Sequence, residues 1–217
     1  MKVQTDPYLN EYFILRNKLN IDNQKDLSKA ENDFAILGIK KLLEEKDYEI
    51  TVEYLKHINY EMFKDVYEFA GKFRTIHVEK NEEILSGLSV NYAEPEDIER
   101  NLNTIFTTIS ETDFESLTKE EQKNFVSNMI VDIWQTHPFR EGNTRGILIF
   151  LRKFLEKYNL RYDPTIFKNY GNYDYMRKAL VAASFEAIDL NVHKNYSYIN
   201  RIVSDIIDDA HLRRIIK

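Results

Sequence analysis

Residues 118–155 read TKEEQKNFVSNMIVDIWQTHPFREGNTRGILIFLRKFL, in which two apolar helical patterns flank a short polar loop. Thr118 and Glu121 have the spacing of a capping box, which satisfies free backbone N–H groups at the start of a helix. Apolar residues then recur at intervals of three and four, which is typical of a helix with one buried face. Pro138 disfavours helical backbone at His137, so the first helix should end there. The pattern predicts two helices joined by a loop of polar side chains.

The rest of the chain has the same apolar spacing, with only 6 Gly and 4 Pro to interrupt it. Further helices are predicted over residues 26–45, 51–70, 95–109, 173–187 and 196–210, with Asp26 as a cap and Gly71 as a stop. Residues 75–90 break this rhythm, because apolar and polar positions alternate on both sides of a turn, which predicts a β-hairpin. The expected fold class is therefore all-α, a helical bundle with one short hairpin.

Composition narrows the class of protein further. The chain has 217 residues, 43% of them hydrophobic and 30% charged, which suits one globular core. Its net charge of -6 gives no overall attraction to a phosphate backbone, so nucleic acid is not an expected partner. It contains no cysteine and no long apolar run, so we expect neither disulfides nor a membrane segment. We expect a cytoplasmic protein, and export as an effector stays open.

The loop between the two central helices has the features of a phosphate site. A helix N-terminus offers unpaired N–H groups and the positive end of the helix dipole. Gly142 lets an anion approach the backbone, and Asn143 can cap the helix with its amide directed outward. Arg145 lies in the first turn, where a cation opposes the dipole and gains little unless an anion binds there.

Two further side chains in this loop could take part in chemistry. Glu141 offers a hard oxygen ligand of the kind that Mg²⁺ takes when it also binds substrate phosphates. His137 has an ordinary pKa close to physiological pH and could accept a proton from a hydroxyl group. Taken alone, the histidine is more simply read as a structural residue at a helix end; taken with its neighbours, it indicates an active site.

The loop resembles the signature of the Fic family, His-x-Phe-x-(Asp/Glu)-Gly-Asn-(Gly/Lys)-Arg-x-x-Arg. The matching residues, in order and without gaps, are His137, Phe139, Glu141, Gly142, Asn143 and Arg145. A second similar stretch comprises Phe63, Val66, Tyr67, Ala70, Gly71 and Arg74. The resemblance covers roughly residues 52–201 and implies a Fic-type helical bundle whose hairpin forms a flap beside the active site.

The resemblance implies a protein adenylyltransferase, which transfers AMP from ATP to a Tyr, Thr or Ser hydroxyl of a target protein, or of itself, and releases pyrophosphate. His137 would be the general base and Glu141 the ligand of Mg²⁺ or Mn²⁺. The ATP phosphates would lie against Gly142, Asn143, Thr144 and Arg145, and Lys80 and Asn81 of the flap would border the nucleotide. The flap would hold the target segment by strand-like pairing.

Two positions depart from the signature. Thr144 stands where adenylyltransferases of the family usually have Gly and Doc-like kinases have Lys, and Leu148 replaces the second arginine. A Doc-like protein kinase therefore stays an alternative. Another is a restrained Fic fold that acts as a binding module or as a toxin held by an antitoxin.

Many relatives carry an inhibitory helix with the motif (Ser/Thr)-x-x-x-Glu-(Gly/Asn). Glu31-Asn32 matches the end of this motif, although Leu27 takes the hydroxyl position, so Glu31 is the candidate inhibitory residue. We expect an N-terminal helical segment over residues 1–50, a Fic domain over 51–201 and a C-terminal helix end and tail over 202–217. The sequence leaves the oligomeric state open.

Overall fold

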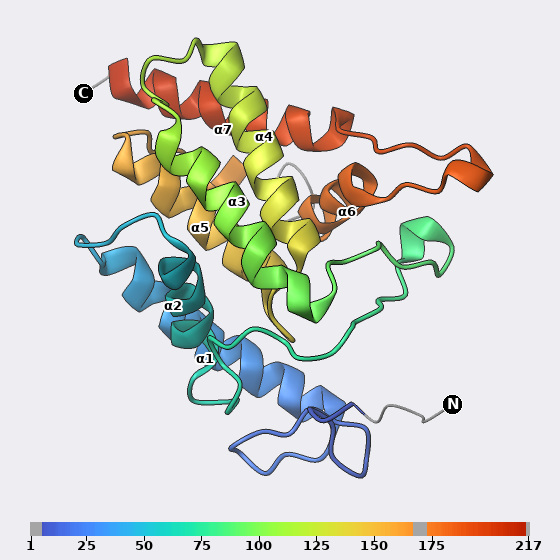
Figure 1. The fold of residues 1–217 in the computed structure, drawn as a ribbon. Helices are drawn as coiled ribbons and strands as arrows, with labels where there is room; N and C mark the ends of the chain where they lie inside the picture. Colours follow the sequence, from blue (N-terminus) through green and yellow to red (C-terminus); the bar gives the residue numbers. More distant parts are fainter. Residues whose placement is uncertain (1–5, 167–172, 216–217) are drawn as a thin grey trace.

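The computed structural model describes residues 6–166 and 173–215 of the chain. The α-helices in this part are α1 (Gln24–Glu44), α2 (Val52–Phe63), α3 (Ile98–Glu111), α4 (Lys119–Thr136), α5 (Asn143–Lys157), α6 (Tyr173–Ser184) and α7 (Ser197–Ile215). They pack as a bundle, with the pair α1 and α2 at one end and α6 and α7 on the opposite side (Figure 1). The prediction of an all-helical fold is confirmed.

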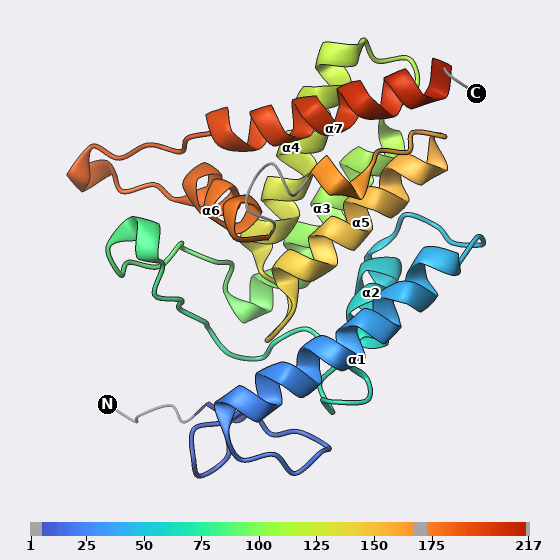
Figure 2. The ribbon, with the colours of Figure 1, turned by 180° about the vertical axis from the view of Figure 1, so that it is seen from behind.

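Helix α4 lies at the centre of the bundle and packs on α3, α5, α6 and α7. It begins with the predicted capping box, since the Thr118 hydroxyl accepts the Glu121 N–H and the Glu121 carboxylate accepts the Thr118 N–H. Trp134 of α4 is buried, as are Phe150 and Phe154 of α5. The view from behind shows α5 running along the bundle between α7 and the α1–α2 pair (Figure 2). The loop that joins α4 to α5 is therefore held between two helices that both contribute large buried side chains to the core.

Helix α1 packs closely on α2 because Gly38 has no side chain. A Cβ atom at this position would lie 2.2 Å from the carbonyl oxygen of Glu61 in α2. The predicted start of α1 was slightly wrong: the cap is Asn23, whose side chain accepts the N–H of Asp26. Helix α2 ends at Phe63, earlier than predicted, and Gly71 adopts a positive φ of 72° in the turn that follows.

The predicted β-hairpin does not form as paired strands. Among the described residues, 75–90 contain only the 3₁₀ turn η1 (Glu83–Leu85), which projects toward α6 (Figures 1 and 2). The chain does reverse here, because the N–H of Glu82 donates to the carbonyl of Leu88. At the next position a second backbone hydrogen bond is absent, because the N–H of Lys80 donates to the Ser89 hydroxyl and not to a backbone carbonyl. We call residues 75–90 the flap segment.

A buried arginine fixes both ends of this segment. The Arg74 guanidinium donates from Nη1 to the carbonyl of Ile76, at 2.7 Å, and from Nη2 to the carbonyl of Ala93. The Ile76 carbonyl, which lies in the predicted hairpin, therefore bonds to a side chain and not to an opposite strand, which is one physical reason for the missing β-ladder. Within the described part of the chain, no helix combines the length and apolar character that a membrane span needs.

Candidate active site

The loop between α4 and α5 is shaped by hydrogen bonds to its backbone. His137 ends α4 in the left-handed conformation, with φ of 48°, and its N–H donates to the carbonyl of Trp134. Arg74 donates from Nε to the carbonyl of His137 at 2.7 Å, and its own N–H donates to the carbonyl of Pro138. Left-handed backbone is costly for a non-glycine residue and persists only where its surroundings impose it. The buried arginine supplies that constraint.

The side chains of two asparagines form hydrogen bonds with the backbone of the same loop. Asn143 accepts the N–H of Phe139 and donates to its carbonyl, at 3.0 and 2.7 Å. This corrects the prediction that Asn143 caps α5 with its amide directed outward; Gly142 is the N-cap residue, and Asn143 is buried. Asn59 of α2 donates to the carbonyl of Glu141 and accepts the N–H of Gly71, so it links the loop to the preceding turn.

His137 is buried, yet neither ring nitrogen has a hydrogen-bond partner within the described structure. Its ring lies against Tyr92, with centroids 4.0 Å apart. Burial and the positive charges of Lys80 and Arg74 hold the pKa of His137 well below its ordinary value. The imidazole is therefore neutral at physiological pH and can accept a proton. A buried polar side chain without partners also indicates a ligand-binding site.

Gly142 lets the loop pass over an aromatic ring. Its φ is 84°, and a Cβ atom here would lie 2.1 Å from the ring of Phe63. Its N–H donates to the Glu141 carboxylate at 2.8 Å. Burial alone would raise the pKa of Glu141, but Lys80, this hydrogen bond and Arg145 together hold that pKa below its ordinary value. Glu141 is therefore an ionised carboxylate at the edge of the loop.

These side chains surround a cavity of about 240 Å³ at the N-terminus of α5. The cavity is lined by Lys80, Trp134, His137, Glu141, Gly142, Asn143, Thr144, Arg145, Asp174 and Arg177. Of the predicted site residues, only Asn81 and Glu31 are absent from this lining. The volume is slightly below the range of about 300–1,000 Å³ for whole small-molecule pockets, so the cavity can hold a small ligand or part of a larger one.

The two positions that depart from the family signature have distinct structural roles. Thr144 accepts a hydrogen bond of 3.0 Å from Nε1 of Trp134. Its hydroxyl thus satisfies the indole of a side chain that is otherwise enclosed by the core. Leu148 is buried in the core and brings no charge to the cavity.

Glu31 reaches the site from α1. Its Oε1 accepts a close hydrogen bond from Nη2 of Arg145, and its Oε2 accepts the hydroxyl proton of Tyr67 at 2.7 Å. Asn32 accepts from Nη1 of the same arginine at 3.2 Å. The arginine also lies over the Phe63 ring, at 4.8 Å from its centroid. The first-turn cation of α5 is thus already paired with an anion of the same chain.

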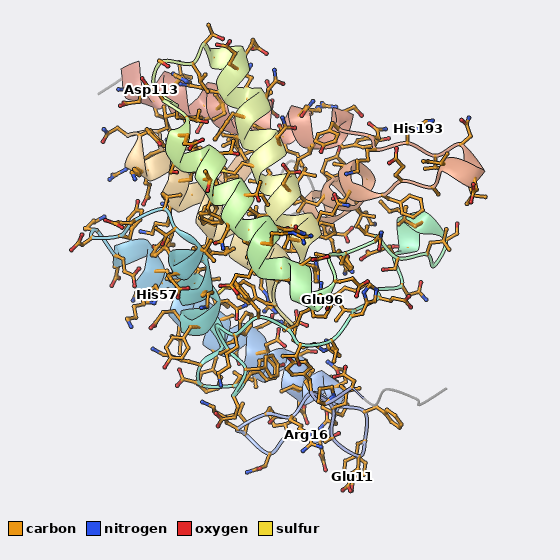
Figure 3. All side chains as sticks on the ribbon, viewed as in Figure 1. Glu11, Arg16, His57, Glu96, Asp113 and His193 are labelled. Atoms are coloured by element: carbon orange, nitrogen blue, oxygen red, sulfur yellow. The ribbon has the colours of Figure 1, made fainter. Side chains whose placement is uncertain are left out.

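Sequence reasoning missed several residues of the site. Arg177 and Asp174 of α6 line the cavity, and Tyr67 orients Glu31. Their places follow from packing between distant elements, and no local pattern indicates it. The other histidines lie elsewhere: His57 and His193 are on opposite sides of the molecule (Figure 3).

The sequence is similar to known proteins of one family. Residues 49–155 match the Fic/DOC family. A probable protein adenylyltransferase y4lH of Sinorhizobium fredii is 32% identical over 140 residues, 64% of this chain and 68% of that protein. The protein adenylyltransferase VbhT of Bartonella schoenbuchensis is 27% identical over 218 residues, 94% of this chain and 44% of that longer protein.

Solved structures share the fold. The Bartonella tribocorum effector BepC, solved with bound AMPPNP, superposes with a TM-score of 0.75 at 20% identity, over 92% of this chain and 95% of that one. The helical bundle, the loop geometry and these similarities define the class: the chain belongs to the Fic/DOC family.

Proposed function

We propose that the protein is a protein adenylyltransferase, which transfers AMP from ATP to a hydroxyl group of a target protein and releases pyrophosphate. The observation that carries this function is the buried, unpartnered, neutral His137 at the wall of a cationic cavity. The names of the relatives from Sinorhizobium fredii and Bartonella schoenbuchensis, both protein adenylyltransferases, support it.

His137 acts as the general base. It takes the proton of the target hydroxyl as the oxygen bonds to the α-phosphorus of ATP, while the bond from that phosphorus to the bridging oxygen breaks and pyrophosphate leaves. The αL backbone at His137, held by Arg74, directs the imidazole into the cavity. The Tyr92 and Trp134 rings beside it limit its movement. A fixed and neutral base is what this proton transfer requires.

The phosphates bind at the start of α5. The first-turn N–H groups of α5 have no partners within their helix, and they lie at the positive end of its dipole. Arg145 and Lys80 add positive charge on two sides of the cavity. Thr144 and Asn143 shape the backbone there, and we expect Asn81 to border the nucleotide from the flap segment.

Glu141 fits the role of ligand for Mg²⁺ or Mn²⁺. It is an ionised hard oxygen donor that lines the cavity. In the described part of the chain, no three His, Cys, Asp or Glu residues gather as a metal cluster, so substrate phosphates and water would complete the coordination. Bound there, the metal would neutralise phosphate charge during the transfer.

Glu31 is proposed as an inhibitory residue. Its carboxylate occupies Arg145, which is then not available to ATP phosphates, and Tyr67 holds the carboxylate in that position. This assigns a regulatory role to residues 1–50, with the Fic domain over 51–201 and the helix end and tail over 202–217. The family match over residues 49–155 supports the first of these boundaries.

The partner is a protein that presents a Tyr, Thr or Ser hydroxyl, and the enzyme itself is one such substrate. An antitoxin that reinforces inhibition is a further proposed partner. We propose the cytoplasm as the site of action, and export as an effector is the alternative. BepA, with a similar fold at a TM-score of 0.74, is itself a type IV secretion system effector.

Mass analysis of the protein incubated with ATP and Mg²⁺ tests this function. We expect AMP on the wild-type protein, more on Glu31→Gly and none on His137→Ala. Phosphate in place of AMP would establish the Doc-like kinase reaction instead. If no variant modifies itself, the same three variants are incubated with cell lysate and labelled ATP. Equal labelling by wild type and His137→Ala would disprove the proposed chemistry.

A further inference from the structure

The phosphate cavity has a cationic wall that lies outside the loop between α4 and α5. Arg177, in the second turn of α6, lines the cavity together with His137 and Lys80. Its side chain is 43% exposed, so the guanidinium can reach a ligand in the opening. Its positive charge also contributes to the lowered pKa of His137, in agreement with this proximity.

Arg177 is one of the few positive charges in the cavity that no residue of α1 neutralises. The triphosphate of ATP carries several negative charges, and Arg145, the cation nearest the α5 N-terminus, is paired with Glu31. Leu148, one turn further along α5, is buried and apolar. Lys80 and Arg177 are therefore the cavity-lining cations that α1 does not engage.

The surroundings of Arg177 leave it suited to bind phosphate. In the described structure its Nη2 donates a hydrogen bond to Oε1 of Glu82, at 2.8 Å. A guanidinium has five N–H donors, so most of its capacity stays available, and its planar fork matches two phosphate oxygens at once. Glu82 is itself buried and accepts the Tyr92 hydroxyl proton at 3.4 Å, so it is a fixed anchor.

We propose that Arg177 is a nucleotide-binding residue that contacts the ATP phosphates, and that Glu82 of the flap segment is the positioning residue that holds it at the cavity. This proposal rests on the proposed use of ATP and extends it to α6. It links the flap segment to nucleotide binding through a single ion pair, so loss of the Glu82 carboxylate should weaken ATP binding only while Arg177 is present.

The neighbouring residue provides a matched control. Lys178 has the same charge and similar exposure, but it pairs with Asp174 at 2.9 Å and Glu83 at 3.5 Å and does not line the cavity. Replacing Lys178 by alanine shows how far the loss of any one positive charge from α6 weakens ATP binding. Because both side chains are partly exposed, neither replacement by alanine should unfold the protein.

The test measures dissociation constants for ATP and for adenosine by calorimetry, with every variant in the Glu31→Gly background so that Arg145 is free. We expect Arg177→Ala to weaken ATP binding by about tenfold or more, the usual worth of a charge-assisted hydrogen bond. Adenosine binding should be unchanged, because adenosine has no phosphate. Lys178→Ala should stay within about twofold for both ligands, as an exposed pair contributes little.

A double-mutant cycle tests the positioning role. Glu82→Gln should weaken ATP binding in the presence of Arg177 and have no further effect in Arg177→Ala. Equal ATP affinities for Arg177→Ala and Lys178→Ala would overturn the proposal, and so would equal losses for ATP and adenosine. If Arg177→Ala loses ATP affinity although the wild type and His137→Ala label lysate proteins equally, this proposal stands and the proposed function fails.

Discussion

The indole Nε1 of Trp134 and the hydroxyl of Thr144 form a hydrogen bond of 3.0 Å between the end of α4 and the first turn of α5. It joins the two helices across the loop that carries His137. Trp134 is enclosed by the core, so its N–H depends on this one acceptor in the described structure. Threonine at this position therefore has a structural role that glycine or lysine could not fill.

Replacing the hydroxyl should cost stability. Thr144→Val keeps the shape but leaves the indole N–H unsatisfied, so we expect the free energy of unfolding to fall by about 1–2 kcal/mol. Thr144→Ser keeps an acceptor and should lose less. Urea denaturation of both variants, alone and in the Trp134→Phe background, measures the coupling. If valine and serine cost the same in the wild-type background, the hydrogen bond does not stabilise the loop.

Glycine is required at 142 and is replaceable at 146. Gly142→Ala combines a positive φ with a Cβ inside the Phe63 ring, so it should destabilise the protein by at least about 2 kcal/mol and abolish transfer. Gly146 lies in the interior of α5, and its added Cβ would be 3.7 Å from the nearest atom. Gly146→Ala should therefore be neutral or stabilising by up to about 1 kcal/mol. Thermal denaturation compares them, and equal melting temperatures would contradict the packing argument.

Acidification should weaken the fold through His137. The folded-state pKa lies well below the ordinary value of about 6.5, so below pH 6.5 the unfolded chain binds a proton that the folded protein does not. Protonation of His137 therefore costs the folded state nothing above that pH, and the cost grows as the pH falls from 6.5 toward the folded-state pKa. We expect the unfolding free energy of His137→Gln to depend less on pH between about 5 and 6.5 than that of the wild type. Parallel curves would show that the histidine titrates normally.

The rate of transfer should report the same base. Because His137 is already neutral at pH 7, raising the pH from 7 to 8 should change the rate of transfer little. The rate should fall only at acidic pH. A pH profile of self-modification in the Glu31→Gly background checks this, and a rate that rises tenfold per pH unit above 7 would contradict a neutral imidazole.

Inhibition by Glu31 should depend on charge and on Tyr67. Glu31→Gln should raise ATP affinity by about tenfold or more, because a charge-assisted bond to Arg145 is lost. Tyr67→Phe should have a smaller effect in the same direction, since it removes only the hydroxyl that orients the carboxylate. Glu44→Gln, at an exposed position of the same helix, is the control. Unchanged ATP affinity in Glu31→Gln would contradict the inhibitory role.

Much of the fold could be predicted, because apolar residues recur every three or four positions along each helix and so mark its buried face. The capping box at Thr118 was predicted for the same reason: its two side chains act within one turn. The start of α1 was predicted less well, because Asn23 and Asp26 both suit a cap and only the backbone distinguishes them. Alternation over residues 75–90 indicated strands, but the Arg74 side chain bonds to the Ile76 carbonyl, which a ladder would have used.

The site could be predicted as far as its local motif extends. His137 and residues 141–145 lie close together in the sequence, and they line one cavity as expected. The side chain of Asn143 differs from the prediction only in its hydrogen bonds, which it makes to the backbone of Phe139. Arg177 could not be predicted, because α6 reaches the cavity only after the bundle has packed. The inhibitory motif indicated Glu31, and the resemblance implied a partner at the second arginine of the signature, where this chain has Leu148. The observed partner is Arg145, a contact between residues far apart in the chain that no local pattern indicates.

One guanidinium joins the two ends of a surface loop to the backbone of His137. Arg74 bonds to the carbonyls of Ile76 and Ala93 on one side and to the carbonyl of His137 on the other. The chain between those first two residues carries Lys80 and Tyr92 to the same centre, where Lys80 lines the cavity and the Tyr92 ring lies 4.0 Å from that of His137. A change in the length or packing of this segment that shifts Arg74 would therefore shift the histidine backbone as well, so insertions tolerated elsewhere on the surface should be harmful here.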